Sequence, residues 1–482
     1  MRTRPWRTGI LGAVLVAGCT LGPNYQVPPV PEGAAEPLVS TDPRLESSEM
    51  PPDDWWRLYR DPTLDGFISE AFAANTDLRV AEANLSAARA LLEASRSQQY
   101  PSTRIEAAAV HGRDPTTDEI LELTGRAPAT IWLYDDIFDM SYELDLFGRV
   151  RRTIEASLAR ADGVMAARDN LRVTIAAETT RAYALVCTFG EQLAVARHSL
   201  AVVMHQSEIL TRRRDAGAGT DFDVVRAQGL VAQTRSNIPT LEGQRRAAVL
   251  QLAVLLGRAP QRAPLEVEQC VTPPHLDAPI PVGDGVALLK RRPDIREADR
   301  QVAAATAGIG IATADLYPRV TLSAFYGGVG TRLQDLTSAN GAAWGVGPAV
   351  SWEFPNQLLA RARIRQAKAN TQAALANFDS TVLKALKETE QSLVNYSAEL
   401  GRHDALLEAQ QEAHRAFGLA RGQYGAGSIS TLDLLSTEQN LVLSDASAAA
   451  SDAALVQDQI AIFKALGGGW NLQASKQDPK AP

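Results

Sequence analysis

The sequence predicts a mixed fold, in which an internally duplicated chain supplies two β-hairpins to a membrane barrel and several long coiled-coil helices to a tube. Three observations predict it. Five short landmarks recur in the same order along the chain. Two segments alternate aromatic with polar residues, as strands with two different faces do. Small apolar residues recur at steps of three and four over unusually long helical segments.

The duplication rests on landmarks that return at a nearly constant distance. The offset is 217 residues for the first two and 208 to 210 for the others, so a loop between them can absorb the difference. Any one match could arise by chance, but five in order indicate two copies of one unit. The pairs are Thr76–Arg79 with Pro293–Arg296, Tyr100-Pro101 with Tyr317-Pro318, Tyr142-Glu143 with Trp352-Glu353, Gly217–Gly219 with Gly425–Gly427, and Leu255–Gly257 with Ala465–Gly467.

Each copy predicts the same series of helices. A helix of about 25 residues ends at a Tyr-Pro pair, because proline cannot continue a helix. After two strands, a very long helix runs to a Gly-Ala-Gly turn, from near Arg149 to Asp215 and from near Leu358 to Gln423. A helix of nearly 40 residues then runs to Gly257 or Gly467. Within the first of these, Pro239 predicts a kink or a break.

Four strands are expected, two in each copy. The clearest is Ile131–Leu146, where Trp132, Tyr134, Phe138, Met140 and Tyr142 share one face and mostly acidic residues share the other. The second copy alternates over 319–326 and 344–354, whereas 103–113 is the weakest strand. Between the second-copy strands we interpret Gly327–Gly330 as a loop. An aromatic face opposite a polar one suits a barrel with lipid outside, although a soluble sheet with one buried face gives the same period.

Four strands cannot close a barrel, since even small membrane barrels use about eight. An open sheet edge in lipid leaves unpaired N–H and C=O groups, which the bilayer does not tolerate. No later segment is apolar enough for a transmembrane helix, so a membrane-spanning chain must share a closed barrel with other copies. This reasoning allows two, three or four chains.

The first eighteen residues predict a lipoprotein signal peptide. Arg2, Arg4 and Arg7 precede a short apolar run, and small residues then lead to Cys19. The run is too short to span a bilayer, and the cysteine takes the place of the usual cleavage site. We therefore expect a mature chain that begins at Cys19, carrying diacylglycerol and an N-acyl chain. Thr20 follows instead of an aspartate that would retain the lipoprotein at the inner membrane, so the outer membrane of a Gram-negative bacterium is favoured.

The formal net charge of the chain is −8, which becomes −11 once the three signal-peptide arginines are removed. An acidic chain is a poor candidate for binding nucleic acid through phosphates. Two cysteines remain, Cys187 and Cys270. They could pair in an oxidising periplasm, but we favour two buried, unpaired residues, because free cysteine is usually buried.

These residues resemble the TolC-like outer-membrane efflux factor family, in its lipoprotein branch of OprM and NodT type. The resemblance covers essentially the whole mature chain. It rests on Trp55-Trp56, on Gly219–Val224, on Leu316–Pro318 and on the segments Cys19–Tyr25, Tyr142–Arg149, Arg292–Ile295 and Ala465–Trp470.

The resemblance implies a homotrimer with a shared twelve-stranded transmembrane β-barrel, continuous with a periplasmic twelve-helix coiled-coil α-barrel. The implied segments are a signal peptide at 1–18, an N-terminal equatorial segment at 19–75, repeats at 76–257 and 292–467, an equatorial linker at 258–291 and a tail at 468–482. The implied function is the exit channel of a tripartite efflux pump. Its partners would be a periplasmic adaptor (membrane fusion protein), usually an inner-membrane transporter of the resistance-nodulation-division (RND) class, and outer-membrane lipid, and no cofactor is implied.

The resemblance also places the periplasmic gate at the turns after the two long helices. Tyr424 and Leu432 match gate positions of the family. The gate aspartate of the OprM branch falls at Ser436 and its arginine at Gln423, so Asp433 is a substitute one turn away. Asp215, Asp221 and Asp223 crowd the other turn, beside Arg212, Arg213 and Arg214. The competing interpretation is that all of these are solvated helix ends, with Asp221 in the N-cap region.

Two alternatives compete with a channel. A lipid-anchored periplasmic scaffold or adaptor without channel activity has no need of two hairpins rich in aromatic residues. A periplasmic enzyme needs catalytic groups, and the sequence has no zinc-protease pair, Walker loop or nucleophile elbow. His198 and His205 lie seven apart and are expected at the solvated surface. The chain is therefore expected not to be an enzyme, and its sequence does not name the cargo.

Overall fold

The computed structural model describes residues 20–40, 51–112, 130–276, 279–283 and 285–469. The chain forms two compact units, each assembled from segments far apart in the sequence. Met1–Pro28, Leu85–Val164 and Ala298–Phe378 make the first unit, and Pro29–Asn84, Met165–Glu297 and Asp379–Pro482 make the second. Cys19, the signal peptide and most of the C-terminal tail lie outside the described residues.

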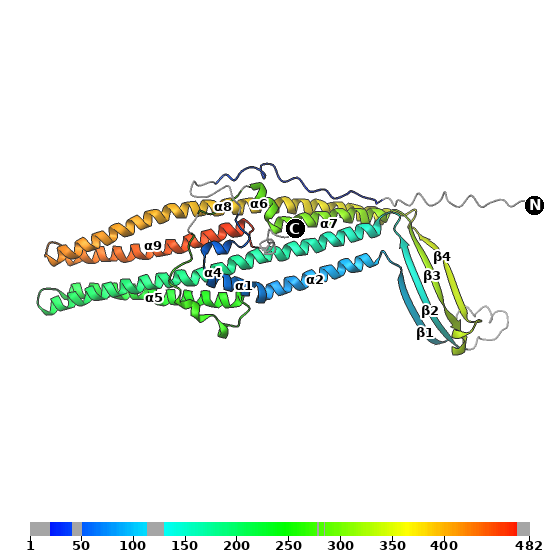
Figure 1. Cartoon of the computed structure of the whole chain (residues 1–482), viewed down its shortest axis with the longest axis horizontal. Coiled ribbons are helices and arrows are strands. Elements are labelled where there is room, and N and C mark those ends of the chain that lie inside the picture. The colour runs from blue at the N-terminus through cyan, green and yellow to red at the C-terminus, as the bar shows by residue number, and fades with distance from the viewer. Residues whose placement is uncertain (1–19, 41–50, 113–129, 277–278, 284, 470–482) are drawn as a thin grey trace, which may run out of the picture. The chain divides into compact units, whose positions relative to one another are not determined.

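The expected helices are confirmed in both copies (Figure 1). The two shorter ones end before their Tyr-Pro pairs, and the two longest end at their Gly-Ala-Gly turns. They are α2 (Thr76–Ser97), α4 (Arg149–Asp215), α5 (Asp221–Leu255), α7 (Pro293–Ala314), α8 (Leu358–Gly425) and α9 (Thr431–Ala465). The shorter elements are η1 (Trp55–Tyr59), α1 (Pro62–Ala74), η3 (Pro260–Arg262), η4 (Leu265–Gln269), α6 (Gly285–Arg291) and η5 (Leu333–Thr337).

Helix α5 runs through Pro239 as one helix, so the break that the proline allowed is not formed. Proline removes only its own N–H donor from the helix, and the turns on either side keep their backbone hydrogen bonds. In the part of the chain that the structure describes, no helix is both long and apolar enough to cross a membrane.

The first unit contains one antiparallel sheet, in the order β1-β2-β3-β4 (Figure 1). Its strands are β1 (Ser102–Gly112), β2 (Ile131–Leu144), β3 (Arg319–Gly330) and β4 (Ala342–Ser351). Both hairpins therefore join one sheet through the β2–β3 pair. The alternating pattern extends beyond the strands themselves, because Leu146, Trp352 and Phe354 lie past the strand ends.

The interpretation of Gly327–Gly330 as a loop is wrong, because these residues are the last part of β3. Gly327 pairs with Ile137, and a Cβ placed on it would lie 2.0 Å from the carbonyl oxygen of Asp136. The glycines are needed for close approach of the backbones, which sequence inspection does not distinguish from loop flexibility.

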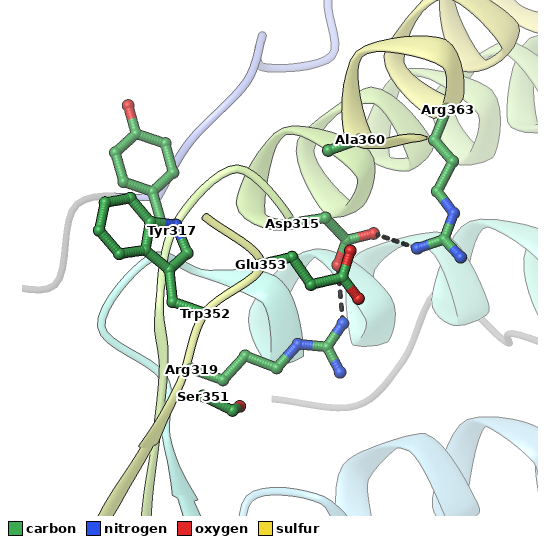
Figure 2. A pocket seen from close by; sticks show the side chains of 8 residues that line it. All are labelled: Asp315, Tyr317, Arg319, Ser351, Trp352, Glu353, Ala360 and Arg363. Atoms are coloured by element: carbon green, nitrogen blue, oxygen red, sulfur yellow. Dashed lines mark hydrogen bonds and ion pairs between the residues drawn. The ribbon is translucent and has the colours of Figure 1, made fainter. Parts of the chain in front are cut away.

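Beside the sheet, ion pairs connect the residue that follows α7 to the start of β3 and to the start of α8. Asp315 accepts a hydrogen bond from Arg319 of β3 at 2.7 Å and one from Arg363 of α8 at 3.2 Å (Figure 2). The Asp315 side chain is 15% exposed, so this carboxylate is held between two guanidinium groups.

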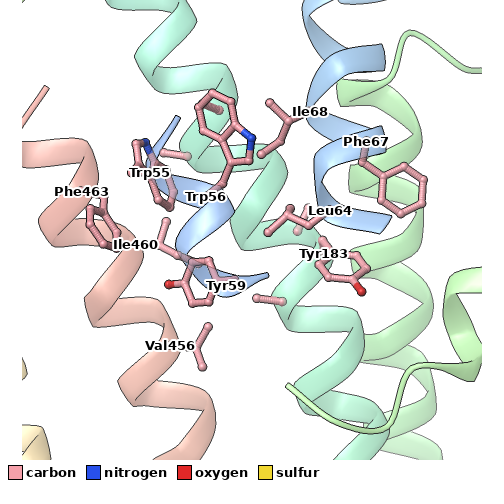
Figure 3. Packing of buried hydrophobic residues seen from close by; sticks show 14 of the residues in the cluster. Trp55, Trp56, Tyr59, Leu64, Phe67, Ile68, Tyr183, Val456, Ile460 and Phe463 are labelled. Carbon is pink, nitrogen blue, oxygen red and sulfur yellow. The ribbon is translucent and has the colours of Figure 1, made fainter. Parts of the chain in front are cut away.

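The core of the second unit is built around aromatic residues that precede the first repeat (Figure 3). The Trp55 ring of η1 stacks on Phe463 of α9, with ring centroids 4.7 Å apart. Tyr183 of α4 donates a hydrogen bond to Asp61, which also caps α1. The N-terminal segment thus fastens helices from both repeats into one core.

The interpretation of the two cysteines as unpaired is wrong. Cys187 of α4 and Cys270 form a disulfide, with Cα atoms 4.8 Å apart and 83 residues between them in sequence. Helix α5 returns along α4, and the segment after it brings Cys270 back to α4. Gly190 makes this approach possible, because a Cβ there would lie 2.1 Å from the Cys270 carbonyl oxygen.

Candidate functional site

One face of the sheet is apolar and exposed. Its centre is a row of Ile105, Phe138, Tyr326 and Trp344, which the register aligns across all four strands. Ile105 and Trp344 are each 72% exposed, and Tyr326 is 67% exposed. A monomeric soluble protein rarely leaves such a continuous apolar surface open to water. The face is therefore a surface that must be covered by lipid or by another molecule.

The opposite face of the same sheet is more polar, although Ile137, Phe325 and Val329 also lie on it. The aligned positions there include Arg104 with Asp139, and Ser141 with Ser323. Among the described residues, β1 and β4 each pair on one side only, so both edges of the sheet are open. Open edges present unpaired backbone N–H and C=O groups to another strand.

The turn between α4 and α5 and the turn between α8 and α9 both lie in the second unit, and each ends in a similar N-cap. Thr220 caps α5, and its hydroxyl donates to Asp223 at 2.7 Å. Ser430 caps α9, and its hydroxyl and backbone N–H donate to Asp433 at 2.6 and 3.1 Å. These hydrogen bonds hold the pKa of the Asp433 carboxyl below its usual range, so it is charged at neutral pH.

Side chains of the two turns meet. The guanidinium of Arg213 lies 4.6 Å from the centre of the Tyr424 ring, and the Tyr424 hydroxyl lies 3.3 Å from that of Thr431. The hairpin of α4 and α5 also packs against the hairpin of α8 and α9 through a small apolar cluster. Its members are Leu210, Ala227, Leu230, Leu435 and Tyr424 itself. A cation over an aromatic face is worth about 0.5–1 kcal/mol when exposed.

The remaining predicted gate residues differ in the contacts they make. Arg214 pairs with Asp215 at 2.6 Å and with Asp221 at 3.4 Å, so one arginine serves two acids. Leu432 is 50% exposed and Ser436 bonds to the backbone of its own helix. The structure thus joins Tyr424 to the α4 turn through Arg213, whereas Asp433 bonds within its own turn. His198 and His205 are exposed, as expected.

Sequence inspection missed a column of acids along α9. Glu438, Asp445 and Asp452 are seven residues apart, the spacing of coiled-coil contact positions. Asp445 accepts from Gln410 and His414 of α8 at 2.9 and 2.8 Å. Asp452 lies 3.6 Å from His403. Their spacing of seven residues is the feature of the sequence that could have identified them.

The carboxyl of Glu438 is buried, and neither of its oxygens has a hydrogen-bond partner among the described residues. Burial raises its pKa to about 7. Burial, and then the charge of Asp452, likewise raise the pKa of Glu191 on α4 to about 7. Ionising either of these buried carboxyl groups lowers the free energy of unfolding. The packing of α9 is therefore less stable than it would be with apolar side chains at these positions.

We predict that stability falls as pH rises between about 4.5 and 7. In this range the folded chain keeps protons on Glu438 and Glu191 that the unfolded chain has lost, and above about pH 7 the penalty is fully present. Glu438→Gln is expected to raise the free energy of unfolding by roughly 2 kcal/mol at pH 8 and by little at pH 4.5. Thermal unfolding followed by circular dichroism at both pH values measures this.

Glu408→Gln, at an exposed position of α8, is the matched control and is expected to change neither melting temperature. An equal gain for Glu438→Gln at both pH values would contradict ionisation as the cause.

The model of a protein family described as "Outer membrane efflux protein" matches residues 67–258 and 286–468. The chain belongs to this family. The toluene efflux pump outer membrane protein TtgC of Pseudomonas putida is 27% identical over 483 residues, covering 97% of this chain and 98% of that protein. The probable outer membrane lipoprotein SilC of Salmonella typhimurium is 27% identical over 474 residues, with 95% and 97% covered.

The fold agrees with that of a solved outer-membrane channel. The structure of OprN superposes with a TM-score of 0.86 at 33% identity, covering 94% of this chain and all of that one. The resemblance to TolC-like efflux factors is therefore confirmed, and the protein is an outer-membrane efflux component. Members of this family are channels and not enzymes.

Proposed function

We propose that this protein is the gated exit duct of a tripartite efflux pump, in which three copies share one twelve-stranded β-barrel and one twelve-helix tube. The exposed apolar row across an open four-stranded sheet carries the proposal. Three such sheets, joined β4 to β1, would satisfy every open edge and turn the apolar faces to lipid. The polar faces would then line a water-filled passage. A scaffold or adaptor without channel activity leaves this surface unexplained.

Conduction through this duct is passive. A periplasmic adaptor and an inner-membrane transporter of the RND class would supply the substrates and the energy. TtgC is named as the outer membrane protein of a toluene efflux pump, and this supports an equivalent place for the present chain. The duct itself contributes a polar passage and a gate, so cargo selection belongs to the transporter.

The lipid anchor is part of the same proposal. Diacylglycerol and an N-acyl chain on Cys19 would tether each copy to the outer membrane. Two residues later, the backbone N–H of Leu21 donates to Phe147, and Arg152 donates to the Leu21 carbonyl at 3.1 Å. The mature chain is thus fastened beside the end of β2, at the edge of the segment that we place in the membrane.

The gate would be formed by the two turns of each copy. Tyr424, held under Arg213, keeps the two hairpins together, and Leu432 is exposed for contact with another copy. Three copies of Asp433 would form a ring of negative charge, with Asp215, Asp221 and Asp223 on the neighbouring turns. Like charges gathered in this way attract cations and repel one another, so ion pairs with basic side chains of the turns would hold the ring closed.

The proposal predicts ion conductance of the purified protein in planar bilayers, low in the closed state. Asp433→Asn is expected to raise it severalfold if the charge of Asp433 holds the gate. Ser430→Ala is the matched control, because it removes the cap partner and keeps the carboxylate. Thr220→Ala and Asp223→Asn repeat the comparison at the other turn.

Equal effects of Asp433→Asn and Ser430→Ala would assign Asp433 to helix capping alone. The duct itself is contradicted if neither the wild-type protein nor any of these variants conducts, although each migrates as a heat-modifiable oligomer on a gel.

A further inference from the structure

The seam between α9 and its neighbours α4 and α8 contains a row of carboxyl groups. Glu438, Asp445 and Asp452 of α9 follow one another at steps of seven residues, and the first two are 0% and 7% exposed. Seven residues make two helical turns, so the three side chains lie on one side of α9. Acids at contact positions between packed helices are costly unless each carboxyl group is neutral or hydrogen-bonded.

On the α8 side of the seam, the acids have partners. Asp445 accepts hydrogen bonds from Gln410 at 2.9 Å and from His414 at 2.8 Å. Asp452 lies 3.6 Å from His403, which pairs with it when the imidazole is protonated. These contacts bond α9 to the other helix of its own hairpin.

On the α4 side, two buried polar side chains lie at the same level without a hydrogen bond. Leu210 of α4 and Leu435 of α9 belong to the apolar cluster that joins the two hairpins. Gln206 precedes Leu210 by four residues, and Glu438 follows Leu435 by three, so both lie on the packed sides of their helices. Gln206 is 4% exposed. Among the described residues, its side-chain nitrogen and both Glu438 oxygens have no hydrogen-bond partner.

A second carboxyl group of this kind lies farther from the turns. One oxygen of Glu191, on α4, is buried and has no hydrogen-bond partner in the part of the chain that the structure describes. Burial, and then the charge of Asp452 on α9, raise the pKa of Glu191 to about 7. Burial raises the pKa of Glu438 to the same value, about 7. The contact between α4 and α9 therefore includes two carboxyl groups that are neutral in acid and charged in mild alkali.

The other charged groups around the seam either keep their charge or act in the same direction. Hydrogen bonds hold the pKa of Asp433 below its usual range, so it stays charged from pH 5.5 to 8. Histidine gains a proton over this range in acid, and a protonated His403 or His414 pairs with an α9 carboxylate. The remaining groups, by helix, are Arg213 of α4, Asp223 and Arg226 of α5, and Glu399 and Arg402 of α8.

We propose that Glu438 and Glu191 form a proton-controlled latch, which keeps the gate closed while both are protonated and releases it when they give their protons to water. This inference rests on the proposed function, because it assigns a regulator to the gate of the duct. Charged carboxylates need water, so α9 separates from α4 and the α8/α9 hairpin moves away from the α4/α5 hairpin. Tyr424 and Arg213 belong to these two hairpins and would part with them. Mildly alkaline surroundings would therefore open the duct.

Conductance in planar bilayers and the distance between the two turns together test the latch. Spin labels on Ala218→Cys and Ala426→Cys mark the exposed turns, because Cys187 and Cys270 are bonded to each other and an acylated Cys19 has no free thiol. About 3% of a group with a pKa of 7 is ionised at pH 5.5 and about 90% at pH 8. Between these values we expect conductance to rise about threefold or more and the labels to move apart.

Glu438→Gln with Glu191→Gln is expected to stay closed at both pH values and to lose most of the response in both measurements, because an amide does not ionise. Each single variant is expected to lose part of it, which keeps the test decisive if the double variant does not assemble. Glu408→Gln, exposed on α8, is the matched control and is expected to respond like wild type. His403→Gln with His414→Gln is expected to keep most of the response.

An undiminished response without the two latch carboxyl groups overturns the proposal, and so does a response that is lost only in the histidine variant. A protein that conducts equally at both pH values, with labels at a constant distance, contradicts the latch and leaves the duct intact. Labels that separate as the pH rises, in a protein that never conducts, would support the latch and contradict the duct.

Discussion

Replacing Val346 with arginine is expected to prevent assembly in the outer membrane. Val346 is 70% exposed on the apolar face, in line with Ala324 and Met140. Placing an arginine in the lipid near the middle of a bilayer costs about 2–4 kcal/mol, and three copies would bear that cost together. We expect loss of the heat-modifiable oligomer from outer-membrane fractions, and no channel conductance from the protein recovered there.

The next residue provides the matched control. Gly347 points to the polar face, and a Cβ placed on it meets no other atom within 4 Å. Gly347→Arg is therefore expected to assemble and to alter conductance at most, since its side chain would extend into water. Val346→Ala, which stays apolar, is expected to assemble normally. Comparable assembly of the two arginine variants would show that the apolar face does not contact lipid.

Removing the disulfide is the second change with a large expected effect. Cys187→Ala or Cys270→Ala is expected to lower the free energy of unfolding by about 2–4 kcal/mol, because the bridge closes a long loop of the unfolded chain. Trypsin is then expected to cleave sooner after Arg262, which is exposed in η3. Arg245 still donates to the Cys270 carbonyl at 2.7 Å, so the segment loosens without being lost.

The double variant separates the bridge from the side chains themselves. It is expected to be no less stable than either single variant, because one missing sulfur already prevents the bond. A reducing agent is expected to destabilise the wild-type protein by a similar amount and to leave the double variant unchanged. Wild-type protein insensitive to complete reduction would contradict a stabilising role.

Local patterns determined the helices and strands. The Tyr-Pro pairs end α2 and α7 because proline cannot continue a helix, and the Gly-Ala-Gly turns end α4 and α8. Alternation at Trp132 and Tyr134 marked β2, since successive strand residues point to opposite faces. The pattern of Gly327–Gly330 does not distinguish a loop from a strand, because glycine serves both in loops and where backbones approach closely.

Contacts between distant segments required the tertiary structure. The sequence could not pair Cys187 with Cys270, because sequence separation does not give distance in space. Nor could it bring Arg213 onto Tyr424 or bury Glu438 of α9 against α4. The sequence by itself determined the duplication, the element types and the two-faced strands, because these depend on residues close together in the chain. Only the tertiary structure decided which side chains meet, because those contacts depend on how α4, α8 and α9 pack and on the sheet register.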